Sequence, residues 1–467
     1  MKNKFLNTSL VFGLGFVFLR GISFLLLPVY TNFLSTYDAG IIFILYALLA
    51  FLNPFYALGM DAALFKFFNS SDYSQKQVIS SSLLSVVVLS FCLSLLLFFY
   101  SSFFINFLDL DYNWVKIIAG ILFFDSISSR LLILLRLFNL PRYFLSIGLI
   151  NIVSSLLLNI IFIHNYKMGE EGAVYALLLT SVIQFIVLFP VLYKHLSIKQ
   201  YNTALSKQML RFGFPFLPAA ILLILTSFVD RFFIEYFLGL EQVGLYGSGY
   251  KIGSVISVVV IAFNLSWQPY YLKSAKDLNF VSNIKLISEK FFIILLFLVV
   301  SVSLWSSPVV KIRFFNQPLI GESFWGSLEI VPWVCFGYFF YGLFILQMPP
   351  LYIKNKQNWS PVFWGVGTTV NIVCNYVLIP SLGILGAAVA TLISFLIMFV
   401  YIKYKNQNWM PLNFINLSLI ILFVLSVLVI IISKMQPSNY LLTCSLYGLY
   451  SFFSYKNLVK NKTINLL

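Results

Sequence analysis

Long apolar runs, separated by short polar or Gly/Pro-containing connections, dominate the hydropathy pattern of the chain. A membrane-spanning helix needs about 20 predominantly apolar residues. Fourteen such runs lie near residues 10–33, 40–60, 79–105, 115–138, 144–163, 172–193, 214–238, 243–271, 291–310, 327–348, 360–380, 383–402, 413–433 and 439–454. The pattern therefore predicts an all-α integral membrane protein with about 14 transmembrane helices.

Composition excludes a water-soluble globular domain, because 60% of the 467 residues are hydrophobic and 10% are charged, which leaves too little polar surface to coat the core. The first run follows a basic head, as in a signal peptide, but it is too long and has no Ala-x-Ala cleavage site, so we expect a retained first span. The four cysteines lie in apolar stretches without CxxC spacing, and neither a metal site nor a disulfide framework is indicated.

The formal net charge of +15 reflects how lysine and arginine are distributed among the connections. When the N-terminus is placed inside, most of the cations in connections fall on that same face, and the opposite face holds Lys167, Lys311, Arg313 and Lys434. Loops rich in Lys and Arg stay cytoplasmic. We therefore predict a multi-pass protein with both termini in the cytoplasm, and we read the positive charge as a membrane signal that excludes nucleic acid as a partner.

Four cations, Arg20, Arg130, Arg231 and Lys251, lie inside apolar runs. A charge at membrane depth is unfavourable unless it faces protein or water, so each is a functional candidate. Arg20 lies near the middle of the first span, and the fourth span carries Asp125 as well as Arg130. One acid for two guanidiniums leaves a positive centre, which favours an anion-binding cavity, and the planar guanidinium fork suits a diphosphate.

The seventh span carries three charges close together, Asp230, Arg231 and Glu235. Arg231 and Glu235 are spaced i,i+4 and can pair on one helix face. Lys251 enters the eighth span at a depth similar to that of Asp230 in the seventh, so these two can pair as well. Two interpretations stay open: ion pairs that fix helix packing, or cations that bind the substrate beside acids that couple transport to an ion gradient.

Weak internal repetition indicates two related bundles. Residues 32–46 align without gaps with residues 236–250, and residues 169–176 align with residues 383–390. Both halves start with an inside N-terminus, so they are parallel repeats around a central cavity. The predicted organisation is an N-terminal six-helix bundle, a basic cytoplasmic linker, a C-terminal six-helix bundle, and two extra helices with a cytoplasmic tail: residues 1–193, 194–213, 214–403 and 404–467.

Two segments resemble a known family. The stretch from Asn371 to Ser394 resembles the "N-x3-N-x3-IP-x2-G-x2-GAA-x-AT-x-x-S" segment of bacterial polysaccharide exporters, and the stretch from Asp230 to Lys251 resembles the same family's seventh and eighth spans. The family is the Wzx-type branch of the multidrug/oligosaccharidyl-lipid/polysaccharide exporter superfamily. Many members have twelve spans, so the last two spans depart from the family pattern.

The resemblance implies a flippase that moves undecaprenyl-diphosphate-linked oligosaccharide repeat units across the bacterial inner membrane, by alternating access, for O-antigen or capsule synthesis. It implies a cationic cavity in which Arg20, Arg130, Arg231 and Lys251 bind the diphosphate. Polysaccharide polymerase and glycosyltransferases are the implied partners. No cofactor is implied, and the energy source would be a proton or sodium gradient for which Asp125, Asp230 and Glu235 are the candidate groups.

Sugar contacts are assigned by residue type. Tyr46, Tyr250, Asn264 and Trp267, with Tyr30 and Tyr246, have side chains that can stack on or hydrogen-bond to sugars. In a chain with 27 tyrosines and eight tryptophans, however, packing or an interfacial belt is the stronger explanation of such residues.

Three rival functions remain open at this point. A membrane-embedded glycosyltransferase or polymerase is indicated only by Asp109 and Asp111 in a short outer loop, and the chain shows no nucleotide-binding loop and no metalloprotease motif. We therefore expect a transporter and not an enzyme. An ion-coupled drug exporter is disfavoured by the excess of buried arginine. A lipid II flippase would also fit fourteen spans.

Overall fold

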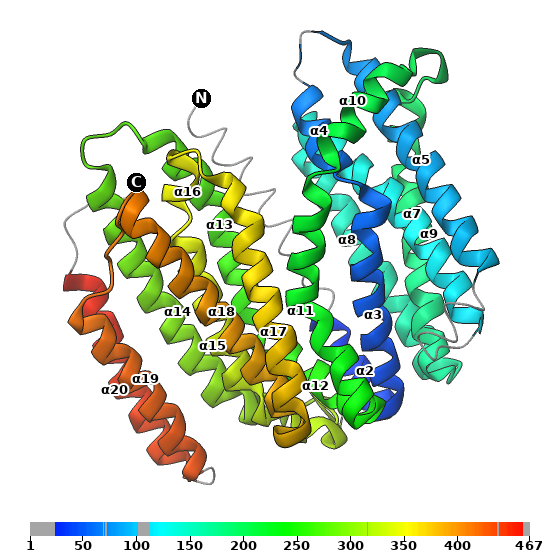
Figure 1. Ribbon diagram of the computed structural model, residues 1–467. Helices are drawn as coiled ribbons and strands as arrows, with labels where there is room; N and C mark the ends of the chain where they lie inside the picture. The colour runs from blue at the N-terminus through cyan, green and yellow to red at the C-terminus, as the bar shows by residue number, and fades with distance from the viewer. Residues whose placement is uncertain are drawn as a thin grey trace. The chain divides into compact units, whose positions relative to one another are not determined.

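The computed structural model describes residues 24–68, 70, 72–100, 112–314, 316–436 and 439–460. The chain divides into two compact units, Met1–Phe228 and Val229–Leu467 (Figure 1). The division falls inside the long helix α11, Phe216–Leu238. This boundary lies near residue 214, the predicted start of the second bundle, but it falls within α11 and not before it.

Unit 1 is helical throughout its described part. Its elements are α2 Leu27–Phe33, α3 Thr36–Ala57, α4 Met60–Phe67, α5 Gln75–Phe99, α7 Tyr112–Leu137, α8 Pro141–Asn159 with its π-helical continuation Ile160–Asn165, α9 Gly169–His195, the 3-10 turn Ile198–Gln200, and α10 Thr203–Gly213. Capping boxes begin two of these helices, because Ser35 pairs with Asp38 at the start of α3 and Ser74 pairs with Gln77 at the start of α5.

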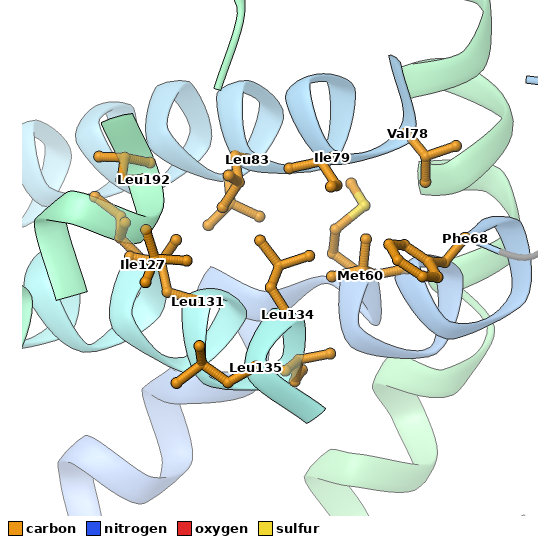
Figure 2. Packing of buried hydrophobic residues seen from close by; sticks show 14 of the residues in the cluster. Met60, Phe68, Val78, Ile79, Leu83, Ile127, Leu131, Leu134, Leu135 and Leu192 are labelled. Atoms are coloured by element: carbon orange, nitrogen blue, oxygen red, sulfur yellow. The ribbon is translucent and has the colours of Figure 1, made fainter. Parts of the chain in front are cut away.

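The core of unit 1 is built by α4, α5, α7, α8, α9 and α10 (Figure 2). Leu131 and Leu134 of α7 point into it beside Met60 of α4 and Leu83 of α5. In the apolar stretch of α7, 61% of the residues are buried, against 28% in α5. Helix α7 is therefore the interior helix of unit 1, whereas α5 leaves most of its apolar surface for lipid.

The segment expected to be a basic linker contains an amphipathic helix. The inner face of α10 buries Leu205 and Met209 against the core, while Lys207 and Arg211 stay outside. Two hydroxyls join this segment to α5, since Ser85 Oγ and Ser206 Oγ lie 2.5 Å apart. The amphipathic pattern of α10 thus docks the segment onto unit 1.

Unit 2 contains the second half of the chain. After α11 come α12 Leu240–Gly253, α13 Val255–Ser274, α14 Phe280–Val310, an antiparallel pair of two-residue strands β1 Arg313–Phe314 and β2 Gln317–Pro318, the 3-10 helix η3 Glu322–Glu329, α15 Val331–Leu346, α16 Pro349–Ile353, the 3-10 turn Gln357–Trp359, α17 Ser360–Leu382, α18 Ile384–Trp409, α19 Leu417–Met435 and α20 Tyr440–Lys460. Helix α15 is the interior helix of this unit, because 78% of the apolar stretch that it forms with α16 is buried.

Twelve helices of the described chain are long and apolar enough to span a membrane. The first predicted span lies largely outside the described residues. The fourteenth corresponds to α20, which has 21 residues but is not among the twelve. The multi-pass, all-α class is confirmed, and the count of 14 stays a prediction.

Two spans differ from their predicted form. The eighth is two helices, α12 and α13, separated by a turn at Ser254. The ninth, α14, begins at Phe280, well before the predicted residue 291, because a helix continues through the polar residues that precede its apolar stretch. Hydropathy registers the part of a helix that lies in lipid and misses its polar extension.

The repeated glycines occupy equivalent places in the two units. Gly169 begins α9 with φ +59°, and Gly383 precedes α18 with φ +61°. A left-handed backbone favours glycine at both positions. Gly172 and Gly386, three residues further on, each pack against the end of the preceding helix. These correspondences fit the repeat that the sequence alignment predicts.

Candidate functional site

Arg130 lies in the interior of unit 1 and is paired. Its side chain is 1% exposed, and its Nε lies 3.1 Å from Asp61 Oδ1. A second nitrogen, Nη1, donates to the Ser126 carbonyl at 3.1 Å and to Ser129 Oγ. The Asp61 side chain is 47% exposed, so the pair joins a buried guanidinium to a partly exposed acidic side chain.

Asp61 reaches Arg130 because the chain turns sharply before α4. Leu58 and Gly59 both adopt left-handed backbone, with φ +43° and +66°. Gly213 at the end of α10 packs on this turn, and a Cβ added to it would lie 2.6 Å from the Leu58 carbonyl oxygen. The turn starts α4 at Met60 and places Asp61 in its first turn, facing α7.

Sequence reasoning missed Asp61. An acid placed directly after an apolar run, in a Gly-Met-Asp turn, was the available signal. Asp125, the acid expected near Arg130, lies near Ser181 of α9 instead. Five residues along a helix rotate a side chain by about 140° beyond one full turn, which points Asp125 and Arg130 to different sides of α7. Arg20 lies outside the described residues.

Unit 2 has its own buried ion pair, formed by adjacent residues of α11. Arg231 Nη1 lies 2.6 Å from Asp230 Oδ1, and both side chains are buried. The hydroxyl of Tyr246 in α12 donates to Asp230 Oδ2. The guanidinium carbon of Arg231 lies 4.4 Å from the centre of the Tyr250 ring, a cation–π contact.

This pair belongs to a longer polar network that joins the two segments on which the family resemblance rests. The Tyr246 side chain also lies near Thr391 of α18. Asn371 Nδ2 of α17 lies 3.5 Å from Thr391 Oγ1, and Asn375 Nδ2 donates to Asn371 Oδ1 at 2.9 Å. The motif residues of α11, α12, α17 and α18 therefore lie together in one buried polar cluster.

Lys251 is buried close enough to Arg231 for the two charges to interact. The pairing of Asp230 with Arg231 joins neighbours in the chain and was not among the expected ones. Pairing of Arg231 with Glu235 and of Asp230 with Lys251 stays a prediction. The fold therefore brings Arg231 and Lys251 close together inside unit 2, with the Asp230 carboxylate beside Arg231.

The aromatic candidates are mostly engaged by other protein groups. The hydroxyls of Tyr30 and Tyr46 form a hydrogen bond of 3.0 Å, and those of Tyr250 and Tyr338 form one of 2.7 Å. Trp267 is buried, and its indole nitrogen donates to the Ile345 carbonyl at 3.3 Å. These contacts favour packing for Tyr30, Tyr46, Tyr250 and Trp267. Asn264 is half-buried, and its predicted sugar contact stays a prediction.

No group of three or more His, Cys, Asp or Glu side chains that could hold a metal ion occurs within the described ranges. The free cysteines among them, Cys92, Cys335, Cys374 and Cys444, are not joined in disulfides.

Known proteins with this fold are membrane transporters. The chain is similar to an inward closed conformation of the lipid II flippase MurJ, with a TM-score of 0.73 and 16% identity over 96% of this chain and 100% of that one. An inward-facing multidrug resistance MATE transporter of the MOP superfamily gives a TM-score of 0.68 and 14% identity, over 84% of this chain and 95% of that one. A MOP superfamily transporter from Pyrococcus furiosus gives 0.61 and 13%, over 86% and 96%.

Sequence comparison is more specific than the fold. An uncharacterized membrane protein of Methanocaldococcus jannaschii is 23% identical over 432 residues, 85% of this chain and 82% of the relative. The family model described as polysaccharide biosynthesis protein matches residues 5–274, more than half of the chain and including Asp61, Arg130 and the Asp230–Lys251 segment. The chain thus has the all-α fold of MOP superfamily transporters and belongs to the polysaccharide biosynthesis protein family.

Proposed function

We propose that the chain is a flippase that moves undecaprenyl-diphosphate-linked oligosaccharide repeat units from the cytoplasmic to the outer leaflet of the bacterial inner membrane. The observation that carries the proposal is membership in the polysaccharide biosynthesis family combined with buried cations, Arg130, Arg231 and Lys251, inside a fold of apolar helices. The diphosphate and sugars would lose hydration in hydrocarbon, and buried cations and hydroxyls replace that hydration.

In the proposed mechanism the two repeats alternate access for the substrate, and Arg20, Arg130, Arg231 and Lys251 bind the diphosphate. Asp125, Asp230 and Glu235 are the proposed groups for coupling to a proton or sodium gradient. The expected partners are the glycosyltransferases that build the repeat unit and the polymerase that extends it. O-antigen or capsule is the proposed end product.

Lipid II transport is the second candidate, favoured by the similarity to MurJ over the full length of that chain. Deletion of the gene in its own bacterium separates the two. We expect unpolymerised repeat units to accumulate in the cytoplasmic leaflet and surface polysaccharide to disappear. Unchanged surface polysaccharide together with lipid II accumulation would support the second candidate, and repeat units that reach the outer leaflet unpolymerised would indicate a polymerase.

The Asp61–Arg130 pair allows a test of the diphosphate role. Arg130→Ala should abolish export, and Arg130→Lys should retain part of it because the charge stays. Asp61→Asn is the matched variant, because it removes the negative charge that pairs with Arg130 but keeps the Arg130 guanidinium. Export is measured as surface polysaccharide, in cells whose membranes contain equal amounts of each variant. Export by Asp61→Asn together with no export by Arg130→Ala supports substrate binding by Arg130. Equal losses in both variants would show that Arg130 serves only the ion pair.

A further inference from the structure

A cavity of about 370 Å³ lies in unit 2 at the end that the topology predicts to face outward. It is formed by the C-terminal end of α14, η3, the C-terminal end of α19 and the start of α20. The lining combines lysine and serine side chains with an apolar wall that includes Trp305 and Pro308. This cavity is separate from the Asp230–Arg231 network, none of whose residues line it.

Two cations converge on this cavity although cations are scarce on the predicted outer face. Lys311 and Lys434 both line it, and they are two of the four lysine and arginine residues that the topology places outside. Of the other two, Arg313 has a partner outside the cavity, Glu322, at 3.2 Å. Glu329 is the acid among the lining residues, so two lysines and one glutamate leave the lining with one net positive charge.

Both ammonium groups contact uncharged groups, and the charge of Lys434 also interacts with the Glu329 carboxylate. Lys434 Nζ donates to the backbone carbonyl of Glu329 at 3.2 Å. Lys311 Nζ lies 5.0 Å from the centre of the Trp325 ring. Both side chains are exposed. Neither contact neutralises the charge, and an ammonium group has three donors, so each lysine keeps capacity for an anion.

Ser433 supplies an independent indication. Its side chain is 7% exposed, and within the described part of the chain its Oγ has no hydrogen-bond partner, yet it lines the cavity. A buried hydroxyl without a hydrogen-bond partner is energetically unfavourable, because it has lost its bonds to water. A ligand oxygen in the cavity would satisfy it.

The surroundings indicate a lipid. The cavity opens at the ends of α14, α19 and α20, where head groups meet the ends of membrane helices. The outer surfaces of α19 and α20 carry exposed apolar side chains, including Ile432 and Leu441, along which acyl chains can lie. Lysine and tryptophan side chains at such a depth are typical of head-group contact.

We propose that this cavity binds the phosphate-bearing head group of an anionic lipid. Lys311 and Lys434 contact the phosphate, the Ser433 hydroxyl donates to one of its oxygens, and the acyl chains lie against α19 and α20. The site does not depend on the proposed flippase function. It adds a second lipid contact, on the predicted outer side of the molecule.

The test uses the full chain purified in detergent, with bound lipid counted by native mass spectrometry during titration with phosphatidylglycerol or phosphatidylcholine. We expect the wild type to prefer phosphatidylglycerol and Lys311→Gln/Lys434→Gln to bind it more weakly, by roughly fivefold for each lysine. Ser433→Ala should weaken binding severalfold. Lys167→Gln/Arg313→Gln removes two other outer cations and is the matched control, which should bind as the wild type does.

Equal weakening in the control pair would show a general charge effect and overturn the proposal, as would equal binding of both lipids by the wild type. Displacement of phosphatidylglycerol by millimolar inorganic phosphate would identify free phosphate as the ligand and overturn the lipid assignment. The thermal unfolding midpoint of each variant, expected to stay at the wild-type value without added lipid, verifies that the lysine variants are folded.

Discussion

At the scale of single residues, the buried Asp230 carboxylate is held by groups that hydrogen-bond to it. Asp230 accepts from the Arg231 guanidinium, from the Arg231 backbone N–H at 2.9 Å and from the Tyr246 hydroxyl. Three donors hold a carboxylate that is 1% exposed. A buried ion pair is tolerated only when such additional hydrogen bonds compensate for lost hydration, so Tyr246 is as much a part of this site as the two charges.

Tyr246→Phe should lower the stability of unit 2. The change removes one hydrogen bond to a charged, buried carboxylate and leaves the ring in place, which is expected to cost about 1.5 to 3 kcal/mol of unfolding free energy. Denaturant titration in micelles measures it. The control is Tyr236→Phe, because Tyr236 lies on the same helix as Asp230 but is 80% exposed. Equal effects of both changes would refute the role given to the Tyr246 hydroxyl.

At the scale of elements, small residues let helices approach closely. Gly249 and Gly253 of α12 form a G-x-x-x-G spacing that faces η3 and α15. A Cβ on Gly253 would lie 2.7 Å from Val334 Cβ, and one on Gly249 would lie 2.9 Å from Ile330 Cγ1. This close approach of backbones is how membrane helices associate when lipid offers no hydrophobic driving force.

Gly249→Ala should destabilise unit 2 by about 1 to 3 kcal/mol, because the added methyl overfills a packed interface that includes the Ser327 backbone. Gly448→Ala in α20 is the matched control, because no atom of the described residues would lie within 4 Å of the added Cβ. The control should be neutral or should stabilise by up to about 1 kcal/mol through helix propensity. The unfolding free energy of both variants in micelles measures these effects. A Gly249→Ala variant as stable as the wild type would contradict the packing argument.

At the scale of the whole molecule, the predicted topology places both termini on the cytoplasmic side. Successive connections between spans then alternate between the two faces of the membrane. Lys167 follows α8 and its π-helical end, and Lys356 lies between α16 and α17. Both side chains are exposed. The topology assigns Lys167 to the outside and Lys356 to the cytoplasm.

Single cysteines test this assignment. In a background with the four native cysteines replaced by alanine, Lys167→Cys in intact cells should react with a membrane-impermeant maleimide, whereas Lys356→Cys should react only after the membrane is opened. The reverse pattern would invert the topology. Labelling of both positions from outside would show that the span count between them is wrong by an odd number.

Local patterns were sufficient for the membrane class and for most helices. Apolar runs of spanning length predict helices because a backbone in lipid must satisfy its own hydrogen bonds. The repeated Gly169 and Gly383 marked helix starts because their backbone is left-handed. Such features depend on residues near one another in the chain, so a single sequence carries them.

Contacts between distant segments were decided by tertiary structure alone. Arg130 meets Asp61, from a different helix, rather than Asp125 on its own, and Asp230 meets Tyr246 within a buried polar cluster that includes Asn371 and Asn375. The docking of α10 and the cavity at Lys311 and Lys434 are of the same kind. Spacing along one helix determines which residues share a face of that helix. Which neighbour each face meets depends on how the helices pack. Because hydropathy is nearly uniform around a helix that lies in lipid, the sequence pattern does not indicate that neighbour.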